Sequence, residues 1–207
     1  MLYAVIALSL LTAALIHPVA PEIIPTHWNL SGEPDAWSDT AYGLAIIPAI
    51  IIASALLFGM LIRHFGSGDM RTQRAAGWFI VLLLGLLYAI QINQAFTVLG
   101  HPVDPLLFFP VIFALFYLGI SFLLPRLSSQ NPVIGIRTPW TMKNAIVWER
   151  THQAGARTFR IAAGLTLLGA FFPDYLFLFI IGSALGATIW LVIVSYREYR
   201  RLETIHG

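Results

Sequence analysis

Residues 131–157 read NPVIGIRTPWTMKNAIVWERTHQAGAR, a polar stretch in a chain that is otherwise mostly apolar. Thr138 followed by Pro139 is a good helix start, because a threonine hydroxyl caps free N–H groups and proline needs no N–H at the first position. We predict a short interfacial helix from about Pro139 to His152. Trp148 and His152 would share one face of it, since they lie four residues apart. We call residues 131–157 the signature segment.

The composition around this segment indicates a membrane protein. The 207 residues are 58% hydrophobic and 11% charged, whereas soluble domains have about 25% charged residues. Such a chain suits a polytopic bundle of helices whose main partner is the lipid bilayer, so we expect it in the cell membrane. The chain contains no cysteine, which excludes a disulfide framework and thiolate chemistry.

Six apolar segments are long enough, with their flanks and some tilt, to cross a bilayer. They are residues 3–16, 44–62, 77–99, 106–124, 159–172 and 176–196. No Lys or Arg precedes the first segment, which favours a transmembrane span over the alternative of a signal peptide. The predicted fold class is therefore all-α, with six transmembrane helices and the short interfacial helix between spans 4 and 5.

The charges sort by side in this arrangement. Every Lys and Arg falls on one side: Arg63, Arg71, Arg74, Arg126, Arg137, Lys143, Arg150, Arg157, Arg160, Arg197, Arg200 and Arg201. The other side receives only acids: Glu22, Glu33, Asp35, Asp39, Asp104 and Asp174. Because basic loops stay in the cytoplasm, both termini are predicted to be cytoplasmic.

The signature segment resembles that of the SdpI family of bacterial immunity and signalling membrane proteins. The matching residues are Asn131, Gly135, Arg137, Thr138, Pro139, Trp140, Thr141, Lys143, Asn144, Trp148 and His152. A second stretch, IPTHWNLSGEPD at residues 24–35, looks like the domain of unknown function that often precedes an SdpI-like half. The resemblance divides the chain at residues 1–125, with spans 1–4 and an outer loop at 18–42, and 126–207, with the signature segment and spans 5–6.

The resemblance implies resistance to a secreted peptide toxin. It also implies that a cognate transcriptional repressor is held at the membrane when toxin is present. The outer loop would meet the toxin, through candidates His27, Asn29, Gly32 and Asp35, and the basic cytoplasmic face would meet the repressor. No direct contact with nucleic acid and no cofactor is expected.

The residues themselves, apart from the resemblance, suggest two other kinds of site. Imidazoles and carboxylates on the outer side suit a metal such as zinc, with His17, His27 and His101 as candidates, although acidic outer loops also follow from the orientation alone. In the third span, Tyr88, Gln91 and Gln94 recur every three residues. Such polar groups line a cavity or join helices, and we favour the second role, with Thr12, Ser54 or Tyr117 as partners.

The sequence contains no recognisable set of catalytic residues that would indicate an enzyme. Glu149 and His152 form a single Glu-x-x-His pair, whereas a metal pair in a bundle needs several copies. We predict that the protein is not an enzyme. The alternatives to the immunity function are a small transporter-like protein that uses the polar third span, or a metal-dependent membrane enzyme or sensor that uses the outer histidines and acids.

Overall fold

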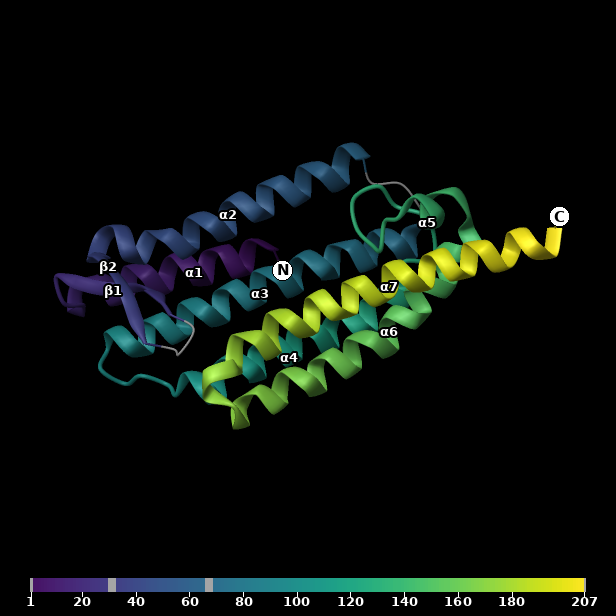
Figure 1. Ribbon diagram of the computed structural model, residues 1–207. Coiled ribbons are helices and arrows are strands. Elements are labelled where there is room, and N and C mark those ends of the chain that lie inside the picture. The colour runs from purple at the N-terminus through teal and green to yellow at the C-terminus, as the bar shows by residue number, and fades with distance from the viewer. Residues whose placement is uncertain (1, 30–32, 66–68, 207) are drawn as a thin grey trace.

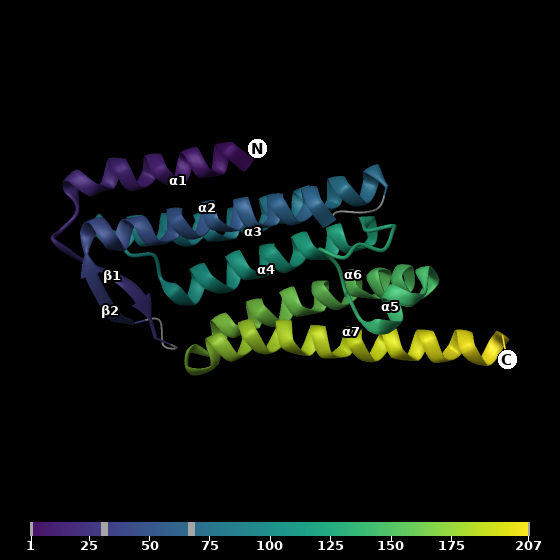
Figure 2. The ribbon, with the colours of Figure 1, turned by 90° about the horizontal axis from the view of Figure 1, so that it is seen from above.

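Long helices dominate the computed structural model, which describes residues 2–29, 33–65 and 69–206, with side chains as far as residue 204. They are α1 (Leu2–Ile16), α2 (Thr40–Phe65), α3 (Met70–Val98), α4 (Pro105–Leu123), α6 (Ala145–Leu168) and α7 (Leu176–His206). They run along one common direction as an elongated bundle (Figures 1 and 2). Short helical turns join them: η1 (His17–Val19), η2 (Leu124–Arg126), α5 (Pro139–Lys143), η3 (Gly169–Phe171) and η4 (Pro173–Tyr175). The predicted all-α membrane fold is confirmed.

The spans follow the apolar segments of the sequence. Within the described residues, five helical segments are long and apolar enough to cross a membrane: Leu2–Val19, Thr40–Phe65, Met70–Val98, Pro105–Arg126 and Pro173–Thr204. Helix α6 is the sixth long helix. Its 24 residues extend about 36 Å at about 1.5 Å per residue, and it packs along α4 and α7. It takes the place of the predicted fifth span, but it begins at Ala145 rather than Phe159 and includes four charged residues, Glu149, Arg150, Arg157 and Arg160.

The predicted interfacial helix is shorter than expected. Helix α5 ends at Lys143, and Asn144 takes an extended conformation with φ −138° and ψ 121°. The Asn144 side chain then accepts hydrogen bonds from the backbone N–H groups of Ile146 (2.8 Å) and Val147 (3.2 Å), which starts α6. An asparagine in this position is a strong helix N-cap. The prediction of one helix from Pro139 to His152 was therefore wrong, since Asn144 divides that stretch between α5 and the start of α6.

The outer loop contains an antiparallel hairpin of β1 (Ile23–Trp28) and β2 (Pro34–Asp39) that the sequence reading missed. Ile24 of β1 is fully buried on the side of the hairpin that faces the helices, where it packs with Ile16, Leu44 and Ala95. A Cβ on Gly43 would lie 2.8 Å from the Ile24 side chain, so glycine at this position lets α2 approach the hairpin. The loop is thus a folded cap on the ends of α1, α2 and α3.

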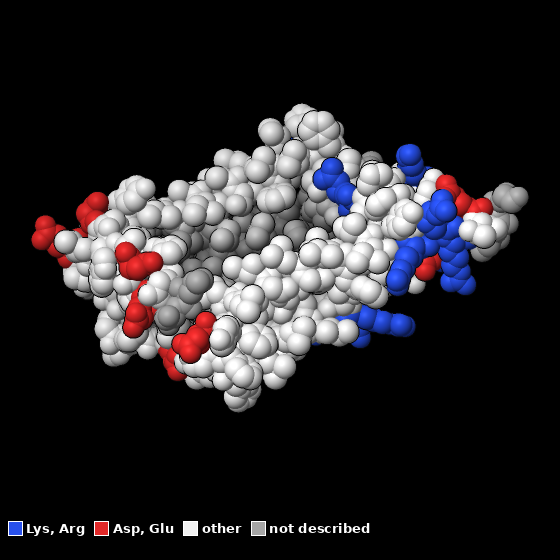
Figure 3. All heavy atoms as spheres, in the orientation of Figure 1, with Lys and Arg blue, Asp and Glu red and all other residues white. Residues whose placement is uncertain are grey.

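The charges separate along the bundle in Figure 3. On the face shown, Lys and Arg gather toward the end that carries α5 and the C-terminus, and acids gather at the hairpin end. This arrangement agrees with the predicted sorting of loops by charge. The orientation itself, with both termini in the cytoplasm, stays a prediction.

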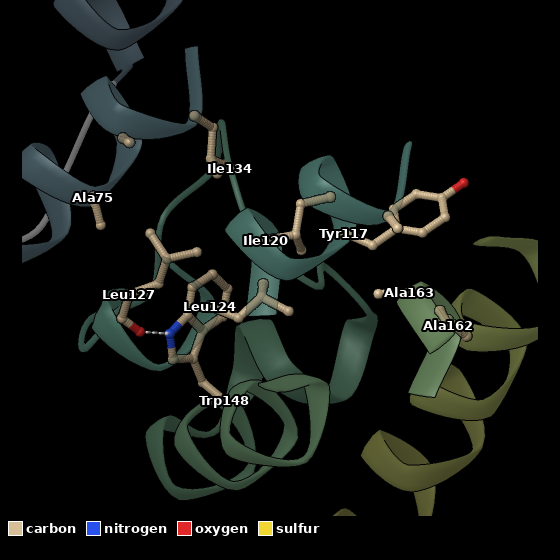
Figure 4. Packing of buried hydrophobic residues seen from close by; sticks show 12 residues of the cluster. Ala75, Tyr117, Ile120, Leu124, Leu127, Ile134, Trp148, Ala162 and Ala163 are labelled. Atoms are coloured by element: carbon tan, nitrogen blue, oxygen red, sulfur yellow. Dashed lines mark hydrogen bonds between the residues drawn. The ribbon is translucent and has the colours of Figure 1, made fainter. Parts of the chain in front are cut away.

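The main hydrophobic core lies at the basic end, where α4, α6 and the signature segment meet. Trp148 is at its centre, with Leu124, Leu127 and Ile134 around it (Figure 4). A second cluster joins α1, α2 and α3 through Ile51, Ile80 and Leu84, among others. The division of the chain into residues 1–125 and 126–207 stays a prediction.

Candidate functional site

The centre of the signature segment is a stacked pair of rings on the first two turns of α6. Trp148 and His152 are both essentially fully buried, and their ring centroids lie 4.1 Å apart at 29°. The Trp148 indole Nε1 donates to the carbonyl oxygen of Leu127 at 2.6 Å (Figure 4). The predicted shared face of these two residues is confirmed, and the pair ties α6 to the end of α4.

Each ring nitrogen of His152 forms a hydrogen bond with the backbone. Its Nδ1 lies 2.8 Å from the Trp148 carbonyl oxygen, which can only accept, so Nδ1 carries the proton. Its Nε2 then accepts the backbone N–H of Ile136 at 3.0 Å. A histidine that accepts in this way is neutral, because imidazolium has two donors and no acceptor. His152 therefore fixes the path of the signature loop, in agreement with a structural rather than a metal-binding role.

Gly135 makes this close approach possible. Its φ of 129° is a conformation that other L residues rarely adopt, and a Cβ would lie 2.7 Å from both His152 Nε2 and Trp148 Cη2. The loop before it is held by Asn131, whose buried side-chain oxygen accepts the N–H groups of Val133 (2.7 Å) and Ile134 (3.1 Å). The backbone thus lies directly against the two rings.

The loop then enters α5 through a reciprocal cap. The Thr138 hydroxyl accepts from the Thr141 N–H at 3.2 Å, and the Thr141 hydroxyl accepts from the Thr138 N–H at 2.9 Å. This capping box confirms the predicted start at Thr138 and Pro139. The Thr138 hydroxyl also donates to Ser195 of α7 at 3.1 Å, and the Trp140 ring packs 5.1 Å from that of Tyr196.

The remaining signature candidates are exposed bases. Arg137, Lys143 and Arg150 lie on the surface, and Arg137 lines a cavity of about 300 Å³ between the loop, α4 and α7. Arg150 pairs with Glu198 of α7 at 2.8 Å. The structure therefore divides the signature candidates into a buried layer, whose polar groups are hydrogen-bonded, and a basic surface that is exposed to solvent.

A cluster around Asp69, which the sequence reading did not single out, joins the two halves of the chain. The Asp69 carboxylate accepts from the Thr72 N–H (2.7 Å) at the start of α3 and from the Ser128 hydroxyl (2.9 Å) before the signature segment. The Thr72 hydroxyl accepts from the Ser129 N–H at 3.1 Å. These bonds, led by the Thr72 N–H, lower the pKa of Asp69 below its ordinary value of 3.8. The pattern Asp-x-x-Thr before a helix was the available signal.

At the opposite end, the hairpin brings two of the outer candidates together. His27 Nδ1 lies 2.6 Å from the Asp35 carboxylate across the two strands, with both side chains largely exposed. Asn29 contacts Glu33, whose backbone N–H donates to the Asn29 side-chain oxygen at 3.0 Å. Gly32 lies outside the described residues. Within the described ranges, no three His, Cys, Asp or Glu side chains come close enough to hold a metal ion, so His17, His27 and His101 are not gathered into one site.

The polar residues of α3 join helices, as the favoured interpretation expected. Gln91 is buried and exchanges two hydrogen bonds with Ser9 of α1, at 2.5 Å and 2.9 Å. The Tyr88 hydroxyl lies 3.1 Å from that of Thr12, one of the predicted partners. Gln94 instead donates to the backbone carbonyls of Gly43 (3.2 Å) and Pro25 (3.4 Å) beneath the hairpin.

Comparison with known proteins agrees with this architecture. Residues 128–195 match the SdpI/YfhL protein family, and residues 4–52 match a domain of unknown function, DUF1648. The chain is also 27% identical over 206 residues to "Immunity protein SdpI" of Bacillus subtilis (strain 168), which covers 96% of this chain and 94% of that protein. The C-terminal part of the chain therefore resembles the SdpI/YfhL family. No solved structure matches it.

The SdpI/YfhL match covers Ser128 and Ser129 of the Asp69 cluster, the stacked rings and Ser195. In this chain, the matched segment corresponds to one packed unit of the signature loop, α6 and most of α7. The DUF1648 match covers α1, the hairpin and the first half of α2. The DUF1648 match thus contains the hairpin, and the SdpI/YfhL match contains the stacked rings.

Proposed function

We propose that this protein confers immunity to a secreted peptide toxin from within the cell membrane. The observation that carries the proposal is the match to an immunity protein over nearly the whole chain, 96% of its length. A multi-pass protein with a folded outer cap meets such a toxin where it reaches the bilayer. Neither the family description nor the relative's name is that of an enzyme, and the proposal assigns no catalytic role.

The test is a survival assay in a bacterial strain that is sensitive to the toxin countered by the Bacillus subtilis relative and lacks its own immunity gene. Cells that express this chain should tolerate at least about tenfold more toxin than cells with the empty vector. As a further control, expression of an unrelated multi-pass membrane protein at the same membrane level should give no protection. Equal killing of both strains, with the chain present in the membrane fraction, would refute the immunity function.

We further propose that the basic cytoplasmic surface holds a transcriptional repressor when toxin is present. Three arginines converge on a shallow site of about 260 Å³ beside Glu198, namely Arg150, Arg157 and Arg201. Such a surface favours an acidic partner. The check is whether a helix-turn-helix repressor encoded beside the gene sediments with membranes only after toxin treatment. Arg157→Glu and Arg201→Glu together should leave the repressor in the soluble fraction, whereas membrane association that survives both reversals would contradict this role.

A further inference from the structure

An apolar cavity of about 360 Å³ lies beneath the outer hairpin. Its walls come from β1, α2, α3, α4 and α7, and thus from both predicted halves of the chain. Ile46, Ile90, Phe109 and Phe177 are among the lining residues. The volume is at the lower end of the range of ligand pockets, and it is enough for one or two large apolar side chains.

Gln94, one of the residues that line this cavity, has a side-chain atom without a partner within the described residues. Gln94 is 3% exposed, and its amide nitrogen donates to Gly43 and Pro25. Within the described part of the chain, its side-chain oxygen accepts no hydrogen bond. A buried acceptor left without a donor costs about 1–3 kcal/mol. The cavity therefore favours an occupant that brings an N–H or O–H group together with apolar surface.

Chemistry discriminates among the possible occupants. A lipid acyl chain matches the apolar walls but has no donor for the Gln94 oxygen. A water molecule has donors but leaves the apolar walls unfilled. A peptide segment supplies both, because a backbone N–H stands beside each apolar side chain.

Charge narrows the class of peptide. The hairpin and the outer loops carry six acids, with no Lys or Arg: Glu22, Glu33, Asp35, Asp39, Asp104 and Asp174. Figure 3 shows acids around this end of the molecule. Complementary potential steers a partner of opposite sign toward such a face, so the segment that fits is cationic as well as apolar.

We propose that this cavity is where the toxin docks: an apolar side chain of a cationic toxin peptide enters it, and a turn of the buried Gln94 amide lets its oxygen accept an adjacent N–H of the peptide. This inference rests on the proposed immunity function and names its binding site. His27, which also lines the cavity and pairs with Asp35, would stand beside the bound segment.

Two matched pairs of variants test the site in the survival assay. Gln94→Leu removes the acceptor, and its control Gln91→Leu removes a buried glutamine one turn away that is fully paired with Ser9 and lies outside the cavity. Ile90→Phe fills the cavity, and its control Ile189→Phe enlarges a residue on α7 that is 61% exposed. We expect both cavity variants to lower the tolerated toxin concentration about tenfold or more, and both controls to stay within about threefold of wild type at equal membrane levels.

A direct measurement uses the absence of cysteine from the chain. In an otherwise wild-type chain, Ile90→Cys introduces a unique thiol in the cavity, which can be labelled with N-ethylmaleimide in nanodiscs. Saturating toxin should slow labelling at least about tenfold, while labelling of an Ile189→Cys control should not change. This readout does not depend on how well a variant protects.

The outcomes separate the two proposals. If the wild-type chain gives no protection, the immunity function fails. If wild type protects and the two cavity variants protect equally well, the docking site is wrong although the function stands. Equal loss in the cavity variants and their controls, or unchanged labelling of Ile90→Cys with toxin, would also overturn the docking site.

Discussion

Substitution of Gly135 by alanine gives the sharpest test of the signature geometry. A Cβ at this position would lie 2.7 Å from two atoms, His152 Nε2 and Trp148 Cη2. Neither ring can move away easily, because Trp148 is bonded to Leu127 and His152 to Ile136. The φ of 129° at Gly135 adds backbone strain for any L residue.

The expected cost is the sum of two effects. A backbone in a region that only glycine adopts readily costs about 1–3 kcal/mol, and overpacking of a filled core costs about 1–3 kcal/mol more. The total of about 2–6 kcal/mol is a large share of a typical unfolding free energy of about 5–15 kcal/mol. At about 2–4 °C per kcal/mol for a chain of this size, the melting temperature should fall by about 4–24 °C.

This shift is measured by thermal unfolding in detergent, which is monitored as the loss of the monodisperse peak in size-exclusion chromatography. Gly164→Ala is the matched control, because that glycine lies within α6 and a Cβ there would meet nothing within 4 Å. Alanine in a helix interior is about 0.5–1 kcal/mol more favourable than glycine, so the control should melt at or above the wild-type temperature. If Gly135→Ala melts within about 2 °C of wild type, the close approach of the loop to the rings is wrong.

Three further predictions follow from other contacts. His152→Phe keeps a ring but leaves the Ile136 N–H without an acceptor, so we expect a loss of about 1–3 kcal/mol in stability; a melting temperature equal to wild type would contradict the assigned tautomer. Because the folded-state pKa of Asp69 lies below its ordinary value, the stabilisation by its carboxylate is present above about pH 4 and disappears as the pH falls through the folded-state pKa. The melting difference between wild type and Asp69→Asn should therefore narrow from pH 6 to pH 3, and a constant difference would count against the Asp69 cluster. Reporter fusions should report outside after Asp39 and Asp104 and inside after Arg71 and Lys143; one reversed fusion refutes the topology.

Local signals in the sequence were sufficient for most of the helices, although α6 begins at Ala145 rather than at the predicted Phe159. The apolar runs located the spans, and Thr138 with Pro139 located the beginning of α5, because caps act over three or four residues. The break at Asn144 was equally local, since Asn before an apolar run is a cap signal. It was overlooked because Trp148 and His152 fitted one continuous helical face, and that face is in fact the first part of α6.

Pairings across the chain were beyond reach of the sequence. Gln91 was expected to join helices, but its partner Ser9 lies 82 residues away, and no local pattern specifies that match. The hairpin was missed because Pro25 lies within β1 and proline in a short run argues against a strand. In the structure, β1 pairs on one side only, with β2, and a strand with a free edge tolerates proline.

Hydrogen-bond pairing separates the polar candidates into two physical kinds. Asn131, Trp148 and His152 are buried with their polar atoms bonded to the surrounding backbone, so they have little capacity left for a ligand. Gln94 is equally buried and lines an apolar cavity, but within the described residues its side-chain oxygen has no hydrogen-bond partner. Asn93 does not line that cavity, although its side-chain oxygen also has no hydrogen-bond partner within the described residues.

This difference in pairing predicts different effects on stability for variants of the signature segment and for variants of Gln94. A change in the signature layer removes bonds that hold the fold, so any loss of immunity should accompany a lower melting temperature. Gln94→Leu gives up two long hydrogen bonds, at 3.2 Å and 3.4 Å, and at the same time relieves the cost of an unpaired buried acceptor. Its melting temperature should therefore change little while protection falls, which is the behaviour of a binding residue rather than a structural one.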